Sequence, residues 1–223
     1  MTIIGTPYGE YNVSKSIRWQ GKITNRVATV CRMFDLTTNG LRERGVTVHC
    51  QLKIKAGDVV YIGGPSGAGK SVLLKELEKA IPPAERVNLN EIKLPDNKTV
   101  IDCIDPNLDI IDALKLLSTA GLNDVFCVLN QPATLSDGQK YRFRLAMALA
   151  AEKKFVFADE FCSELDRITA AVISYNIHKF AKRTGTTFIL AASQEDMLAD
   201  LSPDVMVVTA LSGPAEVVYK QSV

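Results

Sequence analysis

The chain has 223 residues, of which 47% are hydrophobic and 23% charged, and its formal net charge is +1. This length fits one α/β domain with a sizeable core, and the near-neutral charge argues against a dominant nucleic-acid surface. Residues 1–11 lack the apolar centre of a signal peptide, and no apolar run approaches the roughly 18 residues that span a bilayer. We therefore expect a cytoplasmic protein that would serve a membrane only through a partner.

The five cysteines are odd in number, widely spaced and never arranged as C-x-x-C. This pattern argues against a zinc ribbon. It favours reduced thiols in a cytosolic protein.

In chain order, apolar strands alternate with helices. We predict strands at residues 26–30, 46–52, 59–62, 85–89, 155–158, 187–192 and 205–209. Helices are predicted at residues 70–80, 137–149 and 167–183, and residues 94–134 look mainly helical with a break near Gly121. Buried strands that alternate with helices indicate a mainly parallel sheet covered on both faces.

A phosphate-binding loop follows the strand at 59–62. The sequence from Gly64 to Ser71 matches G-x-x-x-x-G-K-[ST], in which glycines turn backbone N–H groups inward around phosphate oxygens. Lys70 is expected to reach the β- and γ-phosphates, and the Ser71 hydroxyl to ligate Mg²⁺. The residues predicted to bind nucleotide here are Gly64, Pro65, Ser66, Gly67, Ala68, Gly69, Lys70, Ser71 and Val72.

Two carboxylates end the strand at 155–158. If that strand lies beside the phosphate loop, Asp159 is near the metal, directly or through water. Glu160 is then placed to polarise an attacking water as general base. The predicted catalytic residues are Lys70, Glu160 and Gln194.

These motifs, with two more, resemble those of an ATP-binding-cassette (ABC) ATPase. The peptide Leu135-Ser136-Asp137-Gly138-Gln139 resembles the family's LSGGQ signature, with Asp137 in place of a glycine. Residues 163–166 resemble the D-loop, and Asp166 lies seven residues after Asp159 as in the family pattern. The resemblance runs from about residue 24 to 219.

The resemblance implies one ABC-type domain over residues 1–223. It implies a P-loop NTPase (RecA-like) core with a mainly parallel sheet, an N-terminal antiparallel β lobe and a small helical lobe, about 94–150, inserted in the core. It also implies a homodimer that sandwiches two ATP molecules with Mg²⁺, in which Ser136, Gly138 and Gln139 of one subunit complete the other's site. Because an acidic side chain facing ATP is unfavourable, we expect Asp137 to cap its helix and point away.

An aromatic residue before the phosphate loop stacks on adenine in the family, and Phe34 has about the right spacing. Such stacking contributes on the order of 1 kcal/mol. A core role for Phe34 is the alternative.

The sequence departs from the family in two places. Gln194 stands where a switch histidine usually contacts the γ-phosphate; glutamine donates a hydrogen bond but carries no titrating proton, so turnover could be slow. The Q-loop glutamine is also missing: Asn90 or Glu91 is the replacement, and Gln131 is a weaker candidate. His49 and His178 do not fit the switch position.

Three functions follow. The preferred one is an ATP-hydrolysing switch or clamp that acts on an unidentified macromolecular partner, because the helical lobe is short and the Q-loop glutamine is absent. The alternative is the ATP-binding subunit of a membrane transporter, with the permease as a separate chain. The third is an ATP sensor with little turnover. Nucleic acid binding through Lys140, Arg142 and Arg144 is left open, although a solvated or dimer-facing helix side explains these residues more simply.

Overall fold

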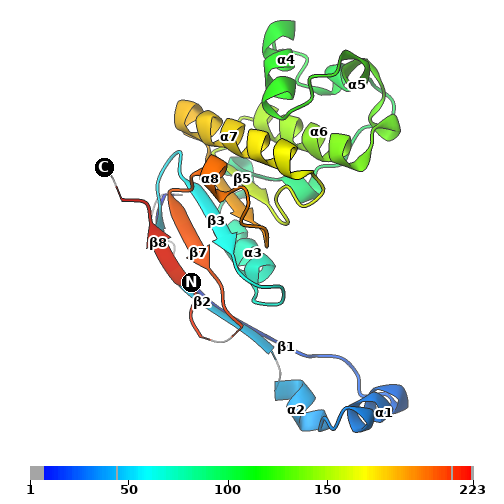
Figure 1. The fold of residues 1–223 in the computed structure, drawn as a ribbon, viewed down its shortest axis with the longest axis vertical. Helices are drawn as coiled ribbons and strands as arrows, with labels where there is room; N and C mark the ends of the chain where they lie inside the picture. The colour runs from blue at the N-terminus through cyan, green and yellow to red at the C-terminus, as the bar shows by residue number, and fades with distance from the viewer. Residues whose placement is uncertain (1–7, 44, 212, 222–223) are drawn as a thin grey trace.

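The computed structural model describes residues 8–43, 45–211 and 213–221. Three parts follow one another along its long axis (Figure 1): a helical lobe at one end, a mixed sheet in the middle, and a small helical projection at the other end. The sheet sets the position of every part that is relevant to function.

The central sheet has six strands in the order β4-β5-β6-β3-β7-β8. Five of them are parallel, and β8 pairs antiparallel with β7 at the edge. The strands are β3 (Val59–Gly63), β4 (Arg86–Asn88), β5 (Phe155–Ala158), β6 (Thr187–Ala191), β7 (Val205–Val208) and β8 (Glu216–Tyr219). The predicted parallel P-loop core is confirmed; β8 was not predicted, because its residues carry no clear alternation.

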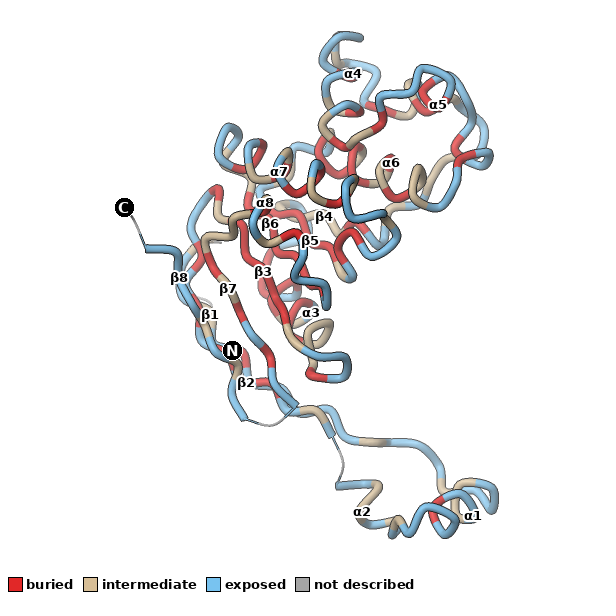
Figure 2. The backbone as a smooth tube through the Cα atoms, in the orientation of Figure 1, coloured by how far each residue is buried: buried red, intermediate tan, exposed pale blue. Residues whose placement is uncertain are grey.

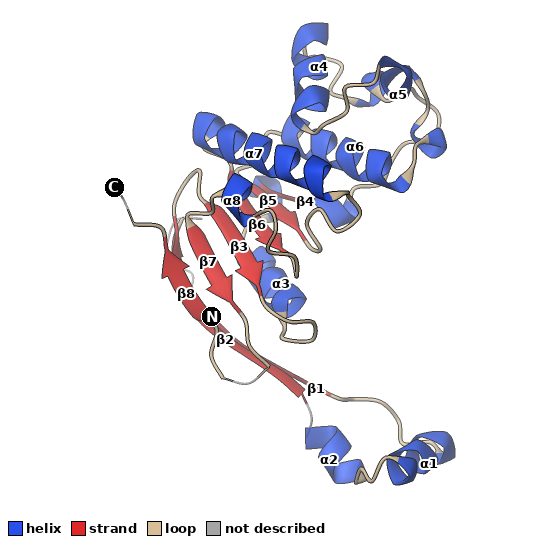
Figure 3. Ribbon diagram, viewed as in Figure 1, coloured by secondary structure: helices blue, strands red, loops and turns tan. Residues whose placement is uncertain are grey.

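Successive residues of β3 face opposite sides of the sheet and enter two separate cores. Val59 and Tyr61 belong to the core shared with the helical lobe, whereas Val60 and Ile62 belong to the core beneath α3 (Lys70–Ala80). All five β3 residues are buried, as expected for a central strand covered on both faces. Figure 3 shows helices above the sheet and α3 on its other side.

Helices α6 (Asp137–Ala150) and α7 (Arg167–Thr184) cover the first face, and the short α8 (Leu198–Leu201) joins them. Beyond them lie α4 (Ile110–Thr119) and α5 (Val125–Leu129). We call residues 92–134 the helical lobe. Its first part was predicted to be helical, but residues 92–109 contain only the 3-10 helix Ile101–Cys103. Other 3-10 turns span Pro83–Glu85, Leu89–Glu91 and Pro132–Thr134.

An antiparallel pair, β1 (Gly9–Arg18) and β2 (Gly45–Ile54), packs against the α3 side of the sheet. The predicted antiparallel β lobe is therefore confirmed. However, the prediction of a strand at residues 26–30 was wrong, since these residues lie in α1 (Asn25–Met33). The Thr24 side chain accepts a hydrogen bond from Val27 N and caps this helix. Apolar residues at 27, 30, 31 and 34 follow the helical repeat, which outweighs the strand preference of valine and threonine.

Helices α1 and α2 (Thr38–Glu43) form a projection between β1 and β2. We call residues 18–43 the arm. Among these residues only Cys31 is buried, so the arm is pale blue or tan almost throughout in Figure 2. The division of the chain into one domain with an inserted lobe at 94–150 stays a prediction, and the arm is a further projection that it did not include.

Candidate active site

The phosphate loop has the backbone shape that its glycines predict. Gly67 and Gly69 have φ values of 81° and 89°, in the left-handed region that favours glycine. A Cβ atom added at Gly69 would lie 2.5 Å from a Val48 methyl carbon and 2.7 Å from a Val46 methyl carbon. The β1–β2 lobe therefore packs directly against the loop, and only glycine fits where they meet.

The helix that follows the loop presents its N-terminus to this space. Gly69 is the N-cap of α3 and supplies no side-chain hydrogen bond to the first turn, which leaves those N–H groups available to phosphate oxygens. The Lys70 ammonium group donates to the carbonyl oxygens of Gly64 at 2.8 Å and Pro65 at 3.0 Å. The lysine therefore lies across the loop, where a bound phosphate would be held.

A cleft of about 480 Å³ opens in front of the loop, between the carboxyl ends of β3, β5 and β6. Ligands of open α/β sheets bind at this edge. Of the predicted site residues, the cleft is lined by Ser66, Gly67, Gly69, Lys70, Ser71, Val72, Asp159, Glu160 and Gln194. Val46, Phe161, Ser163, Ala191, Ala192 and Ser193 complete the lining and were not singled out as site residues.

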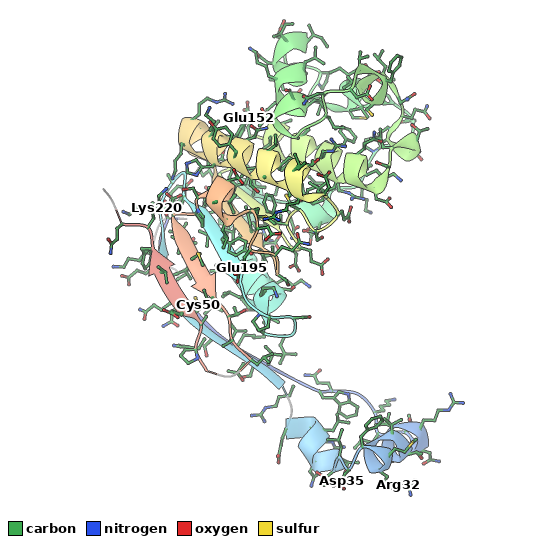
Figure 4. All side chains as sticks on the ribbon, in the orientation of Figure 1. Arg32, Asp35, Cys50, Glu152, Glu195 and Lys220 are labelled. Atoms are coloured by element: carbon green, nitrogen blue, oxygen red, sulfur yellow. The ribbon has the colours of Figure 1, made fainter. Side chains whose placement is uncertain are left out.

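The structure does not bring Phe34 to this cleft. Phe34 ends α1 in the arm with 71% of its surface exposed, and it is absent from the lining. Figure 4 shows its neighbours Arg32 and Asp35 at the tip of the arm, well away from Glu195, which follows Gln194. Neither the stacking role nor the core role of Phe34 is realised here. The residues between β1 and β2 form the arm, and the arm carries Phe34 away from both the cleft and the core. Val46 is the β2 residue that borders the cleft instead.

The end of β5 carries the two predicted carboxylates in a strained turn. Glu160 has a φ of 53° and Cys162 a φ of 59°, conformations that cost a non-glycine residue about 1–3 kcal/mol and that cluster at functional sites. Asp159 accepts a hydrogen bond from Glu160 N at 3.1 Å, and Cys162 N donates to the Tyr141 hydroxyl at 2.9 Å. Burial raises the pKa of the Cys162 thiol to about 12, so this thiol is a neutral packing group.

Asn90, one of the Q-loop candidates, holds the same turn from the side of β4. Its side-chain amide donates to the Asp159 carbonyl oxygen at 3.1 Å and accepts from Asp159 N at 2.8 Å. Glu91, the other candidate, is exposed and makes no such contact. The two Q-loop candidates therefore differ in position, which the sequence could not decide. Asn90 contacts the Asp159 turn and Glu91 does not, and the contact of Asn90 is with the Asp159 backbone.

A polar chain continues from Asn90 to the helix that follows the phosphate loop. Asn88 accepts from Asn90 N at 3.0 Å and donates to the Glu78 carboxylate at 2.9 Å. Glu78 is only 8% exposed and is paired with Arg86 at 3.3 Å. No sequence motif pointed to this series of hydrogen bonds. The polar residues at 86, 88 and 90 in the sequence were the available signal.

The end of β6 positions Gln194 through the backbone. The Tyr61 hydroxyl donates to the Gln194 carbonyl oxygen at 2.6 Å. Burial, with a smaller contribution from Glu195, raises the pKa of Tyr61 to about 12, so the tyrosine stays a hydrogen-bond donor at every physiological pH. Tyr61 was also missed by the sequence analysis.

The signature-like peptide begins α6 with reciprocal caps. The Ser136 hydroxyl accepts from Gln139 N at 3.3 Å, and Ser136 N donates to the Gln139 side-chain oxygen at 2.9 Å. Ser136, and not Asp137 as expected, therefore caps the helix. The Asp137 side chain is 91% exposed and lies 3.7 Å from Lys140. Ser136, Gly138 and Gln139 do not line the cleft of their own subunit.

The basic residues of α6 are used within the chain. Arg142 donates to the carbonyl oxygens of Gly138 and Gly121, and Lys140 pairs with Asp137. Arg144 is half-buried. These contacts favour the structural explanation of this stretch over a nucleic-acid surface.

The oxygen donors in the cleft suit a magnesium ion. Ser71 and Asp159 both line it, and hydroxyl and carboxylate oxygens are ligands that Mg²⁺ accepts together with substrate phosphates. In the described part of the chain, no group of three or more His, Cys, Asp or Glu side chains is arranged to hold a metal. The ion would therefore depend on phosphate oxygens for much of its coordination.

This loop, this strand end and this sheet define the class of P-loop cassettes that bind ATP. The family model "ABC transporter" matches residues 48–163, just over half of the chain. The chain therefore belongs to the ABC transporter family, and it is an ABC-type ATPase that uses ATP with Mg²⁺.

Relatives of known role are longer than this chain. The methionine import ATP-binding protein MetN of Streptococcus agalactiae is 27% identical over 202 residues, which cover 74% of this chain and 55% of MetN. The alpha-hemolysin translocation ATP-binding protein HlyB of Escherichia coli is 30% identical over 174 residues, covering 63% of this chain and 24% of HlyB. The chain thus spans about half the length of the first of these relatives and a quarter of the second.

Solved structures support the fold at greater distance. The ATP-binding cassette MJ0796, solved as a dimer in a post-hydrolysis state with ADP and Pi, has a TM-score of 0.66 at 19% identity and covers 96% of this chain and 99% of its own. CbiO1 of Clostridium perfringens, part of a transporter complex, has a TM-score of 0.58 at 21% identity, covering 75% and 79%. Within the described residues, no helix combines the length and the apolar character that crossing a bilayer requires.

Proposed function

We propose that this chain is the ATP-hydrolysing subunit of an ABC transporter, closing as a homodimer on two ATP molecules and acting on a separate membrane permease. The observation that carries the enzymatic part is the convergence of Lys70, Ser71, Asp159, Glu160 and Gln194 on one cleft. The printed roles of MetN and HlyB, in import and translocation, support the transport part. From the sequence alone the soluble clamp was preferred; the relatives favour the transporter.

A second copy of the chain supplies what the cleft lacks. Ser136 and the start of α6 do not line their own subunit's cleft, and α6 is a capped helix of 14 residues whose first N–H groups and positive dipole end suit a γ-phosphate. In a head-to-tail dimer, Ser136 and Gly138 of one subunit would face the phosphate held by the other. ADP lacks the γ-phosphate. ATP therefore favours the closed dimer, and hydrolysis allows the dimer to open.

The residues then divide the chemistry of hydrolysis. Lys70 and the N-terminus of α3 bind the phosphates, while Ser71 and Asp159 would hold Mg²⁺, which would neutralise phosphate charge. Glu160 accepts a proton from the attacking water, and the Gln194 amide orients the γ-phosphate or the water. Because Gln194 carries no titrating proton, turnover is slower than with a histidine at this place.

A second candidate, the soluble clamp, is favoured by the arm. The arm is an exposed projection, and its neighbouring strands β1 and β2 already pair to form the β lobe without it. Such an added, exposed projection offers a binding surface for a macromolecular partner outside the membrane.

The Glu160→Gln variant tests both the proposed hydrolysis and the proposed ATP-dependent dimer. Phosphate release at saturating ATP and Mg²⁺ is expected to fall about 10²- to 10⁴-fold, the usual worth of a general base. Light scattering should then show an ATP-dependent dimer that does not decay. Glu152→Gln, on an exposed turn, is the matched control and should keep full turnover.

The trapped dimer also distinguishes the candidates. Recovery of a polytopic permease with Glu160→Gln and ATP, but not with ADP, supports the transporter. Recovery of soluble partners alone favours the clamp. Full turnover in Glu160→Gln would refute the role of Glu160 altogether.

A further inference from the structure

The arm carries an exposed apolar and basic face. Val30, Met33 and Phe34 lie at helical spacing on α1 and are 51%, 75% and 71% exposed. Arg26, one turn earlier, lies on the same side of the helix. Residues 18–43 hold five basic and two acidic residues, a net charge of +3, and none of these basic residues takes part in an ion pair within the described chain.

The helical lobe carries the complementary face. On α4, Ile110, Ile111 and Leu114 are 56%, 55% and 41% exposed. On α5, Val125, Phe126 and Leu129 are 57%, 74% and 60% exposed. Residues 92–134 hold three lysines and six aspartates, a net charge of −3. Two of these aspartates, Asp109 and Asp124, cap α4 and α5 beside the apolar residues.

The two faces cannot meet within one subunit. Figure 1 shows the arm and the helical lobe at opposite ends of the long axis, with the sheet and the phosphate loop between them. Exposed apolar side chains that gather beside charges of one sign typically mark an interface. A second copy of the chain brings the complementary face from outside.

The proposed dimer carries the partner's lobe towards the arm. The arm grows out of β2 next to the phosphate loop, since Val46 of β2 lines the cleft. The N-terminus of α6 lies next to α5, since the Gln139 side chain donates to the Cys127 sulfur at 2.9 Å. The arm thus neighbours the phosphate loop, and α5 neighbours Ser136. When the phosphate loop of one subunit faces the partner's Ser136, the arm of the first subunit and α5 of the partner lie on the same side of the dimer.

We propose that the arm of one subunit docks on the exposed faces of α4 and α5 of the other when the dimer closes on ATP. Two such contacts form per dimer, related by the two-fold axis. The proposal rests on the ATP-bound dimer of the proposed function. It adds a contact outside the nucleotide cleft that stabilises the closed state through apolar burial and opposite charge.

The test measures the dissociation constant of the ATP- and Mg²⁺-bound dimer in the full-length Glu160→Gln background. Phe34→Ser and Phe126→Ser should each raise it about tenfold or more, because each removes a large buried apolar group twice per dimer. The two changes together should add little beyond one, since both remove the same contact. Leu211→Ser, at an equally exposed apolar residue outside both faces, should leave it unchanged.

A milder pair of variants tests the charges without disturbing the fold. Asparagine caps helices as well as aspartate, so Asp109→Asn with Asp124→Asn removes two charges and keeps both caps. These changes, like Arg26→Gln, should weaken the dimer about two- to fivefold at low salt and have no effect at high salt. Lys75→Gln on α3 is the control.

Three results would overturn the docking alone, and a fourth would overturn it together with the proposed function. The first is a dimer of unchanged affinity in all arm and lobe variants, which refutes the docking and leaves the proposed function intact. The second is additive effects of Phe34→Ser and Phe126→Ser, which place the two residues in separate contacts. The third is loss of binding to phosphatidylserine-containing vesicles in Phe34→Ser with unchanged dimerisation, which assigns the arm to a membrane surface. Absence of any ATP-dependent dimer, even with the arm and lobe unaltered, refutes the proposed function itself and the docking with it.

Discussion

The nucleotide cleft and the arm are built in opposite ways from one chain. The cleft lies at the edge of a sheet whose central strand β3 is entirely buried, and its Asp159 turn is held by side-chain hydrogen bonds from Asn90. The arm has one buried residue, Cys31, and short helices held by local caps. The cleft is thus held by the core and by its own hydrogen bonds, whereas the arm would gain most of its apolar burial only from a partner.

This difference predicts a large contrast in stability. Leu77→Ala removes a fully buried side chain beneath the sheet and should lower the free energy of unfolding by about 2–5 kcal/mol. Met33→Ala, on the exposed side of the arm, should change it by less than about 0.5 kcal/mol. Urea unfolding of the nucleotide-free chain, followed by far-UV circular dichroism, measures both values.

The single tryptophan allows the stability of the arm to be measured separately from that of the core. Trp19 lies at the base of the arm and is half-buried, so its fluorescence reports on the arm while circular dichroism reports mainly on the core. A fluorescence transition at lower urea than the circular dichroism transition is expected, because the arm has few buried contacts. Coincident transitions, with Met33→Ala as costly as Leu77→Ala, would show that arm and core unfold as one unit.

The same contrast explains what the sequence could predict. In the core, long apolar runs next to glycine and proline leave few alternatives, and the helix Lys70–Ala80 and the strand Phe155–Ala158 have the predicted bounds. In the arm, Val27, Thr29 and Val30 favour a strand locally, and the Thr24 cap together with the helical repeat decides otherwise. Where little is buried, a few local hydrogen bonds determine the structure, and propensity is a weak guide.

The site shows a similar division. Lys70 and Ser71 belong to a fixed local motif, so their place in the site was predicted from spacing alone, and both line the cleft. Asn90 and Tyr61 act through partners 69 and 133 residues away along the chain, and no local pattern indicates such contacts. Phe34 was misassigned because counting residues back from the loop assumes that no structure intervenes, and the arm does intervene.

The docking proposed for the arm also limits where a permease could bind in the proposed transporter. A helical lobe covered by the partner's arm in the ATP-bound state would have less apolar surface left for a permease. In the closed dimer we therefore expect a permease to bind outside the exposed faces of α4 and α5.

Within the cleft, the lysine of the phosphate loop should have the largest effect on binding. Lys70→Ala removes a charged donor to the phosphates and should weaken ATP binding by about 10- to 100-fold, from a loss of about 1.5–3 kcal/mol. Lys75→Ala, exposed on the same helix, should leave binding unchanged. Calorimetric titration with ATP and Mg²⁺ measures both, and equal affinities would remove Lys70 from the site.

The Asn90 contact predicts a smaller and different defect. Asn90→Ala removes two hydrogen bonds from the Asp159 backbone, together worth about 1–2 kcal/mol, so kcat should fall about 5- to 30-fold with little change in KM for ATP. The Mg²⁺ concentration for half-maximal activity should stay the same, since the amide holds the strand end and does not bind the ion.

Magnesium dependence is therefore the decisive readout for Asn90. A clear rise in the Mg²⁺ requirement of Asn90→Ala would show that Asn90 is a metal ligand, the alternative that the sequence left open. Asn97→Ala, in the exposed loop that follows, controls for general loosening of this segment.

The smallest expected effect lies at the end of β6. Gln194 is positioned through its backbone by Tyr61, so a histidine should take the same place and change kcat by no more than about fivefold, roughly 1 kcal/mol. An amide does not titrate, whereas histidine has a pKa near 6.5. Gln194→His should therefore add a step between about pH 6 and 7 to the pH profile of kcat that the unaltered enzyme lacks.

Gln194→Ala should lower kcat without adding such a step, because it removes the hydrogen bond and supplies no proton. If the alanine variant hydrolyses ATP as fast as the unaltered chain, the Gln194 side chain plays no part in turnover, and the cleft depends on Lys70, Asp159 and Glu160 alone.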